Sequence, residues 1–204
     1  MTTVDPIEAR ILGVLVEKQM TTPDAYPLTL AGVVAGSNQS TNRHPVMSVT
    51  DEEVEAALIR LHDGGLATPV RRPGDRATKY RHKLAEALEL GTESLAVLAV
   101  LLLRGAQTSG ELRQRTERYA TFQSIDEVEA VIDRLEEEGL AERLSRQPGQ
   151  SQRRVAQLLG DPDPEAPISE AVPLAPDPPD LEARVAALED RFTDLLRRLG
   201  ETDL

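Results

Sequence analysis

Apolar residues recur at helical spacing near the start of the chain, which predicts an amphipathic helix there. The preceding Asp5, Pro6 and Glu8 fit the N-cap, the first helical position and the glutamate of a capping box. The apolar stripe of this helix consists of Ile7, Ile11, Leu12, Leu15 and Val16. Similar patterns and caps predict further helices over residues 28–35, 50–65, 92–103, 108–119 and 124–139.

Two pairs of short runs rich in apolar and β-branched residues predict β-hairpins. The first pair covers residues 66–72 and 76–84, on either side of the turn signal Pro73-Gly74. The second pair covers residues 140–146 and 152–159 and also encloses a Pro-Gly turn. Each hairpin follows directly on a predicted helix that ends in Gly-Leu.

The helix before each hairpin is an internal repeat, because residues 54–67 recur as residues 128–141 at an offset of 74. A capped helix followed by a short basic hairpin is typical of a winged-helix domain. We therefore predict an α+β chain, mainly α with small β-hairpin wings, in which residues 1–90 and 91–160 form two tandem winged-helix domains. The residues that recur are Val54, Glu55, Ala56, Arg60, Leu61, Gly65, Leu66 and Ala67, as Val128, Glu129, Ala130, Arg134, Leu135, Gly139, Leu140 and Ala141.

Beyond the repeats the sequence changes character. Residues 161–180 contain seven of the 14 prolines among acidic and small residues, which predicts a disordered linker. Residues 181–200 carry an apolar heptad seam of under three heptads, which predicts a short coiled-coil helix. Because such a helix is marginal alone, we expect it to form a homodimer or to dock on a domain. The seam consists of Leu181, Val185, Leu188, Phe192, Leu195 and Leu199.

The composition favours a non-enzymatic cytoplasmic protein. The chain has no cysteine, and its histidines, His44, His62 and His82, do not have metal-ligand spacing. No nucleotide-binding or nucleophile motif is present, so we expect no catalytic residue, metal or cofactor. Neither a membrane span nor a secretion signal is predicted.

The net charge of −12 is concentrated near the C-terminus, where residues 161–204 hold 12 Asp/Glu and 4 Lys/Arg. The basic residues gather around the hairpins, and two interpretations remain open. They contact DNA phosphates, or they protect strand edges from pairing with other chains. The candidate DNA-binding residues of the hairpins are Arg71, Arg72, Arg76, Lys79, Arg146, Arg153 and Arg154.

A polar segment over residues 37–47 is a second candidate, through Asn38, Asn42 and Arg43. Its amides and cation could select DNA bases or a protein partner, or its side chains could simply cap a local turn. The helices that would enter a major groove begin instead with carboxylates, at residues 51–55 and 126–129. Carboxylates repel a polyanion, which argues against conventional insertion.

Four segments together resemble the YceH-like family of bacterial proteins. They are residues 8–18, residues 22–30 (Thr-Pro-Asp-Ala-Tyr-Pro-Leu-Thr-Leu), residues 38–47 (Asn-Gln-Ser-Thr-Asn-Arg-His-Pro-Val-Met) and residues 101–113. The resemblance covers about residues 5–160. It implies a tandem winged-helix fold and no defined mechanism.

We therefore expect a DNA-associated protein of transcription regulation, in which the wings hold the backbone of double-stranded DNA and residues 38–43 supply selectivity. The alternative is a protein-interaction adaptor that does not bind DNA. The acidic helices would suit that role.

Overall fold

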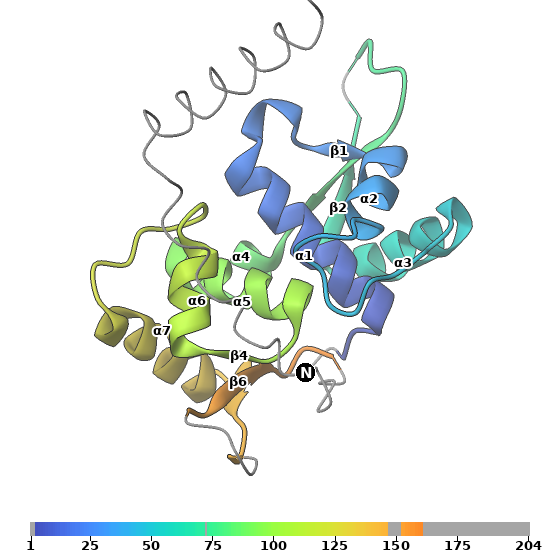
Figure 1. The fold of residues 1–204 in the computed structure, drawn as a ribbon. Coiled ribbons are helices and arrows are strands. Elements are labelled where there is room, and N and C mark those ends of the chain that lie inside the picture. Colours follow the sequence, from blue (N-terminus) through green and yellow to red (C-terminus); the bar gives the residue numbers. More distant parts are fainter. Residues whose placement is uncertain (1–2, 72, 147–151, 161–204) are drawn as a thin grey trace, which may run out of the picture. The chain divides into compact units, whose positions relative to one another are not determined.

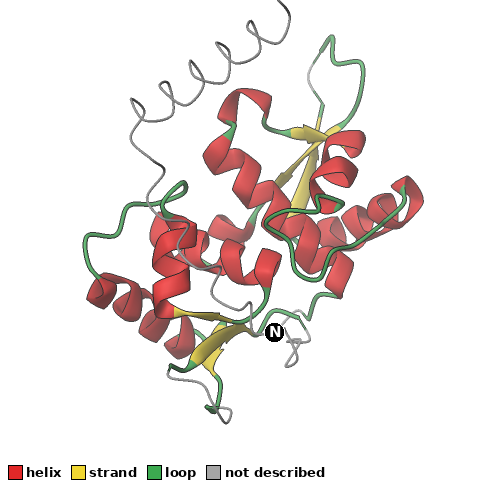
Figure 2. Cartoon of the chain, in the orientation of Figure 1, coloured by secondary structure: helices red, strands yellow, loops and turns green. Residues whose placement is uncertain are grey.

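The computed structural model describes residues 3–71, 73–146 and 152–160 (Figure 1). This part of the chain has a mixed α+β fold of helices and small antiparallel sheets, as predicted (Figure 2). The first half comprises α1 (Pro6–Thr21), the 3-10 turn η1 (Pro23–Ala25), β1 (Leu28–Thr29), α2 (Leu30–Ser37), α3 (Asp51–Asp63), β2 (Ala67–Val70), β3 (Lys79–His82) and α4 (Leu84–Ala87). The second half comprises α5 (Thr92–Arg104), β4 (Gln107–Thr108), α6 (Ser109–Thr116), α7 (Ile125–Glu137), β5 (Ala141–Arg143) and β6 (Arg154–Gln157).

Both halves have the same order of elements: a long helix, a short strand, two helices and a hairpin. Each half forms one three-stranded antiparallel sheet, in the order β1-β3-β2 or β4-β6-β5. The short strand pairs with the last strand of its hairpin, as Leu28 with Tyr80 and Gln107 with Val155. The sequence repeat is therefore a repeat of topology.

The predicted helix caps are confirmed. Asp5 and Glu8 form the capping box of α1, and Thr50 with Glu53 forms that of α3. Gly65 follows α3 with a φ of 73°, in the left-handed region that glycine enters without strain. Local sequence signals set these boundaries.

The structure differs from the predicted elements in four ways. β1 and β4, with two residues each, were not predicted, because their pairing partners lie about 50 residues away along the chain. The predicted helix over residues 28–35 begins two residues later, since Leu28 and Thr29 pair with β3. The strands of both hairpins are shorter than predicted, and the short helix α4 was missed.

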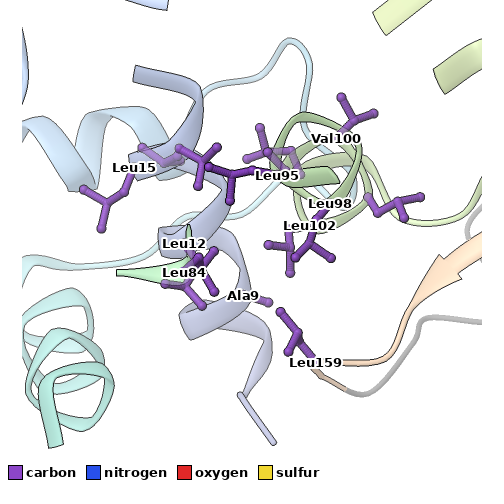
Figure 3. Close-up of a cluster of buried hydrophobic side chains, with 14 of the residues drawn as sticks. Ala9, Leu12, Leu15, Leu84, Leu95, Leu98, Val100, Leu102 and Leu159 are labelled. Atoms are coloured by element: carbon purple, nitrogen blue, oxygen red, sulfur yellow. The ribbon is translucent and has the colours of Figure 1, made fainter. Parts of the chain in front are cut away.

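The hydrophobic core is built around α1 and α5, which pack on each other (Figure 3). Both helices are buried on every side over ten consecutive residues, 8–17 in α1 and 94–103 in α5. Gly13 permits the close approach, because a Cβ atom there would lie 2.8 Å from the Leu103 Cγ atom. Hydrogen bonds from the Val4 amide to Leu159 O, and from the His44 amide to Leu103 O, also join the halves.

Burial makes His82 a source of acid sensitivity. Its Nδ1 atom accepts a hydrogen bond from the Leu84 amide at 3.3 Å. Burial lowers the pKa of His82 from 6.5 to about 4. Because the unfolded chain binds this proton more tightly, stability is lost as the pH falls from 6.5 towards 4, by about 3 kcal/mol in all.

We expect His82→Asn to abolish this part of the pH dependence, since the asparagine Oδ1 atom can replace the acceptor. Urea denaturation at pH 7 and pH 4.5 measures the effect. The exposed His62 provides a control for the substitution itself, His62→Asn. Equal acid sensitivity in His82→Asn and wild type would refute the assignment.

Candidate functional site

The first hairpin presents free cations. Arg71 and Arg76 are exposed in the loop between β2 and β3, and Lys79 is half-buried at the start of β3. Among the residues that the structure describes, none of these three side chains forms an ion pair. Arg72, predicted alongside them, lies outside the described residues. The loop therefore carries positive charge that the described part of the fold does not neutralise.

Some arginines of the second hairpin are exposed and another is buried. Arg146 and Arg153 are exposed and form no ion pair within the described ranges. Arg154 is buried, with its Nη2 atom 3.5 Å from a carboxylate oxygen of Glu111 in α6. Arg154 was predicted to lie on a DNA-binding surface, but its side chain is buried against α6.

A further arginine of this hairpin, Arg143, was missed by the sequence analysis. Its guanidinium lies 2.7 Å from Glu129 and 2.6 Å from Asp133, and it also pairs with Glu136. Partial burial alone would lower the pKa of Arg143, but these three carboxylates raise it above its ordinary value. The signal was available, since residues 129, 133 and 136 share one face of a helix.

This arginine changes the electrostatics of α7. A single cation of the neighbouring strand pairs with three carboxylates of the helix, so the cluster keeps a net charge of −2. In the first half the position equivalent to Arg143 is Pro69, so Glu55 of α3 has no such partner. The two repeats thus present different charges from corresponding helices.

An open hollow of about 370 Å³ lies between α6, α7 and the second hairpin. Glu129 is hydrogen-bonded within it by the Ser109 hydroxyl group as well as by Arg143. The residues that line the hollow are Ser109, Gly110, Ile125, Glu129, Arg143, Arg146, Gln152, Arg153 and Val155.

Side chains of the polar segment around residues 38–43 bond to the rest of the fold. Arg43 is buried, and its Nη2 atom lies 2.6 Å from the Glu17 carboxylate. The side chain of Asn38 bonds both the carbonyl group and the amide group of Val49. Asn42 accepts a hydrogen bond from Arg104 in the second half. Asn38 and Arg43 are thus directed inward, which supports the turn interpretation over the predicted selectivity for DNA.

Glu17 is the centre of this buried network. Burial by itself raises the pKa of Glu17, but the hydrogen bonds and charge of Arg43, helped by Lys18, outweigh it and leave the pKa below 4.5. The hydroxyl group of Tyr119 donates to Glu17 Oε1 at 3.2 Å. Burial and the charge of Glu17 raise the pKa of Tyr119 to about 12. Since Tyr119 follows α6, the network ties the first half to the second.

The described residues contain no group of three or more His, Asp or Glu side chains placed to hold a metal ion. Within the same ranges, no helix is long and apolar enough to cross a membrane. The predicted dimerisation residues, Leu181, Val185, Leu188, Phe192, Leu195 and Leu199, lie outside the described part of the chain.

Residues 4–150 match the family described as "Protein of unknown function, DUF480". A UPF0502 protein of Xanthomonas axonopodis pv. citri is 42% identical over 204 residues, which cover 97% of this chain and 91% of that protein. The chain belongs to this family. The UPF0502 protein YceH of Escherichia fergusonii is 40% identical over 200 residues, covering 94% of this chain and 92% of that protein. The YceH protein of Salmonella newport is 41% identical over 207 residues, covering 95% and 96%.

The similarity to the UPF0502 proteins extends beyond residues 5–160, the part from which the resemblance was recognised. It confirms the predicted family. The names of these relatives state no activity, so a functional argument for this chain must come from its own side chains.

Proposed function

We propose that this member of the UPF0502 family is a non-enzymatic tandem winged-helix protein that associates with double-stranded DNA and acts in transcription regulation. The observation that carries the proposal is the set of exposed cations on both hairpins that form no ion pair with any described residue: Arg71 and Arg76 on the first, Arg146 and Arg153 on the second. A hairpin with free guanidinium groups beside a helix is suited to contacting phosphates.

The topology of each half supports the winged-helix interpretation. The order helix, strand, helix, helix, hairpin is that of a winged-helix domain, and the hairpin would be the wing. The sheet of each half, with its short first strand paired to the last strand, agrees with it.

The charges favour backbone contact over base reading. The first turn of α3 contains Asp51, Glu52 and Glu53, and α7 begins with Asp126 and Glu127. A helix that presents carboxylates at its N-terminus is poorly suited to enter a major groove. We expect DNA association to be dominated by phosphate contacts and therefore to depend weakly on sequence and strongly on salt.

Replacing Arg71 and Arg76 with alanine tests the proposal. We expect weaker binding of a mixed-sequence duplex. The slope of the logarithm of the binding constant against the logarithm of the salt concentration should also fall in magnitude by about 1.8, because each of the two lost phosphate contacts contributes about 0.9. Fluorescence anisotropy from about 50 to about 200 mM salt measures both quantities. The pair Arg118→Ala and Arg134→Ala is the matched control, because it removes the same charge from exposed positions outside the hairpins, in the turn after α6 and in α7. Equal effects of the two pairs would refute a specific role for the hairpin.

One observation favours the second candidate function, a protein-interaction adaptor. Ile59 is 58% exposed on α3, between the acidic first turn and the end of the helix. An exposed apolar side chain on a charged helix suits a protein contact. Absence of DNA binding by wild type at about 50 mM salt would favour this function over DNA association.

A further inference from the structure

We propose that the hollow between α6, α7 and the second hairpin binds a phosphate group of the DNA backbone, held by Arg146 and Arg153. This inference rests on the proposed function and names one of its contact sites. It also places this phosphate contact in the second half of the described chain.

The hollow combines cations with a neutral donor. Arg146, which follows β5 by three residues, and Arg153, which directly precedes β6, both line it and are exposed. Gln152 contributes an amide group to the same lining, whereas the hydroxyl hydrogen of Ser109 is already donated to Glu129. Guanidinium groups with additional hydrogen-bond donors are the usual partners of phosphate in proteins.

The carboxylate in the hollow, Glu129, is partly offset by its own hydrogen bonds. Glu129 already accepts hydrogen bonds from the Ser109 hydroxyl group and from Arg143 at 2.7 Å. Arg143 in turn is shared with Asp133 and Glu136 outside the lining. Arg143 therefore offsets one of these three negative charges, and Arg146 and Arg153 must outweigh the remaining two. Arg146 and Arg153 remain as the charges without a partner among the described residues.

Space in the hollow is available at the start of α6. A Cβ atom added to Gly110 would meet no atom within 4 Å. The partial positive charge of the helix N-terminus adds to the field of the two arginines. The first half lacks these features. Ala31, in the helix capped by Thr29, stands at the position equivalent to Gly110, and Pro69 stands at the position equivalent to Arg143.

Gly110→Glu is the decisive variant. The substitution places a carboxylate in the hollow, yet an acidic residue in the first turn of a helix is stabilising and glycine is the poorer helix former. We expect the affinity for a labelled mixed-sequence duplex to fall by about tenfold or more at about 50 mM salt. Thermal unfolding should show a stability equal to or above that of wild type.

Ala31→Glu is the matched control, since it adds the same charge at the same helical position of the first half, where Ala31 is exposed. We expect its affinity to change by less than about twofold. Arg146→Ala with Arg153→Ala should weaken binding in the same way as Gly110→Glu. If wild type binds DNA and Gly110→Glu binds as Ala31→Glu does, the hollow is not a phosphate site, although the proposed function stands.

Inorganic phosphate distinguishes the source of the group. If wild type fails to bind DNA at the lowest salt, the proposed function fails, and the backbone assignment fails with it. Phosphate binding by wild type that Gly110→Glu abolishes, measured by phosphorus NMR, would then assign the hollow to a free phosphate compound. Absence of binding to both DNA and inorganic phosphate would overturn the phosphate site altogether.

Discussion

Glu17→Leu is expected to lower the free energy of unfolding by about 3 to 5 kcal/mol, because it leaves the buried cation of Arg43 without its counter-ion. The Arg43 side chain is fully buried, and its Nη2 atom lies 2.6 Å from the carboxylate that would be lost. Tyr119 would lose its acceptor at the same time. Urea denaturation followed by circular dichroism measures the loss.

Two further variants separate the buried charge from the general effect of a substitution. Glu86→Leu removes the partner of Arg81 in an exposed pair, and we expect a change of at most about 1 kcal/mol. Adding Arg43→Met to Glu17→Leu removes the unpaired charge, so the double variant should be more stable than Glu17→Leu alone. A double variant less stable than the single one would contradict this explanation.

The Glu17 pair also has a defined pH dependence. Because the pKa of Glu17 in the folded protein lies below its ordinary value of 4.5, its contribution to stability is fully present above pH 4.5. The contribution is lost as the pH falls through the pKa of the folded state. The stability difference between wild type and Glu17→Leu should therefore narrow on acidification below pH 4.5.

Leu98→Ala is expected to cost about 2 to 5 kcal/mol, since it removes a fully buried side chain from the centre of α5 and leaves a cavity. Leu98 belongs to the core between α1 and α5 (Figure 3). We expect residues of both halves to lose protection against hydrogen exchange together, because this core is common to them.

The exposed Ile59 offers the control for this prediction. Ile59→Ala deletes a comparable apolar group from a helix, but from solvent, and should change stability by at most about 0.5 kcal/mol. Loss of protection confined to the second half in Leu98→Ala would show that the two halves unfold independently.

The helices were predictable because their signals are local. Caps such as Asp5 and Thr50, and the glycine at position 65, specify where a helix begins and ends without reference to the rest of the chain. The strands β1 and β4 were not predictable in the same way. Two residues acquire extended pairing only when a distant hairpin lies beside them, as Thr29 does with Lys79.

The candidate site was predicted only in part, because some of its features depend on local sequence and others on distant residues. The exposure of Arg71, Arg76, Arg146 and Arg153 agrees with their place around hairpin turns, which project from a fold. The burial of Arg43 could not be read from its neighbours, because its partner Glu17 lies 26 residues away. The family resemblance was confirmed, but it marked residues 38–47 as distinctive without distinguishing a binding loop from a structural one.

The mutual burial of α1 and α5 constrains how this gene can change. Each helix is enclosed on every side over ten residues, so each copy of the duplicated unit covers apolar surface of the other. A truncated product with only one copy would expose that surface and become a substrate for proteases and chaperones. The two repeats can therefore differ in surface charge, as they do at Pro69 and Arg143, while the shared core still requires both of them.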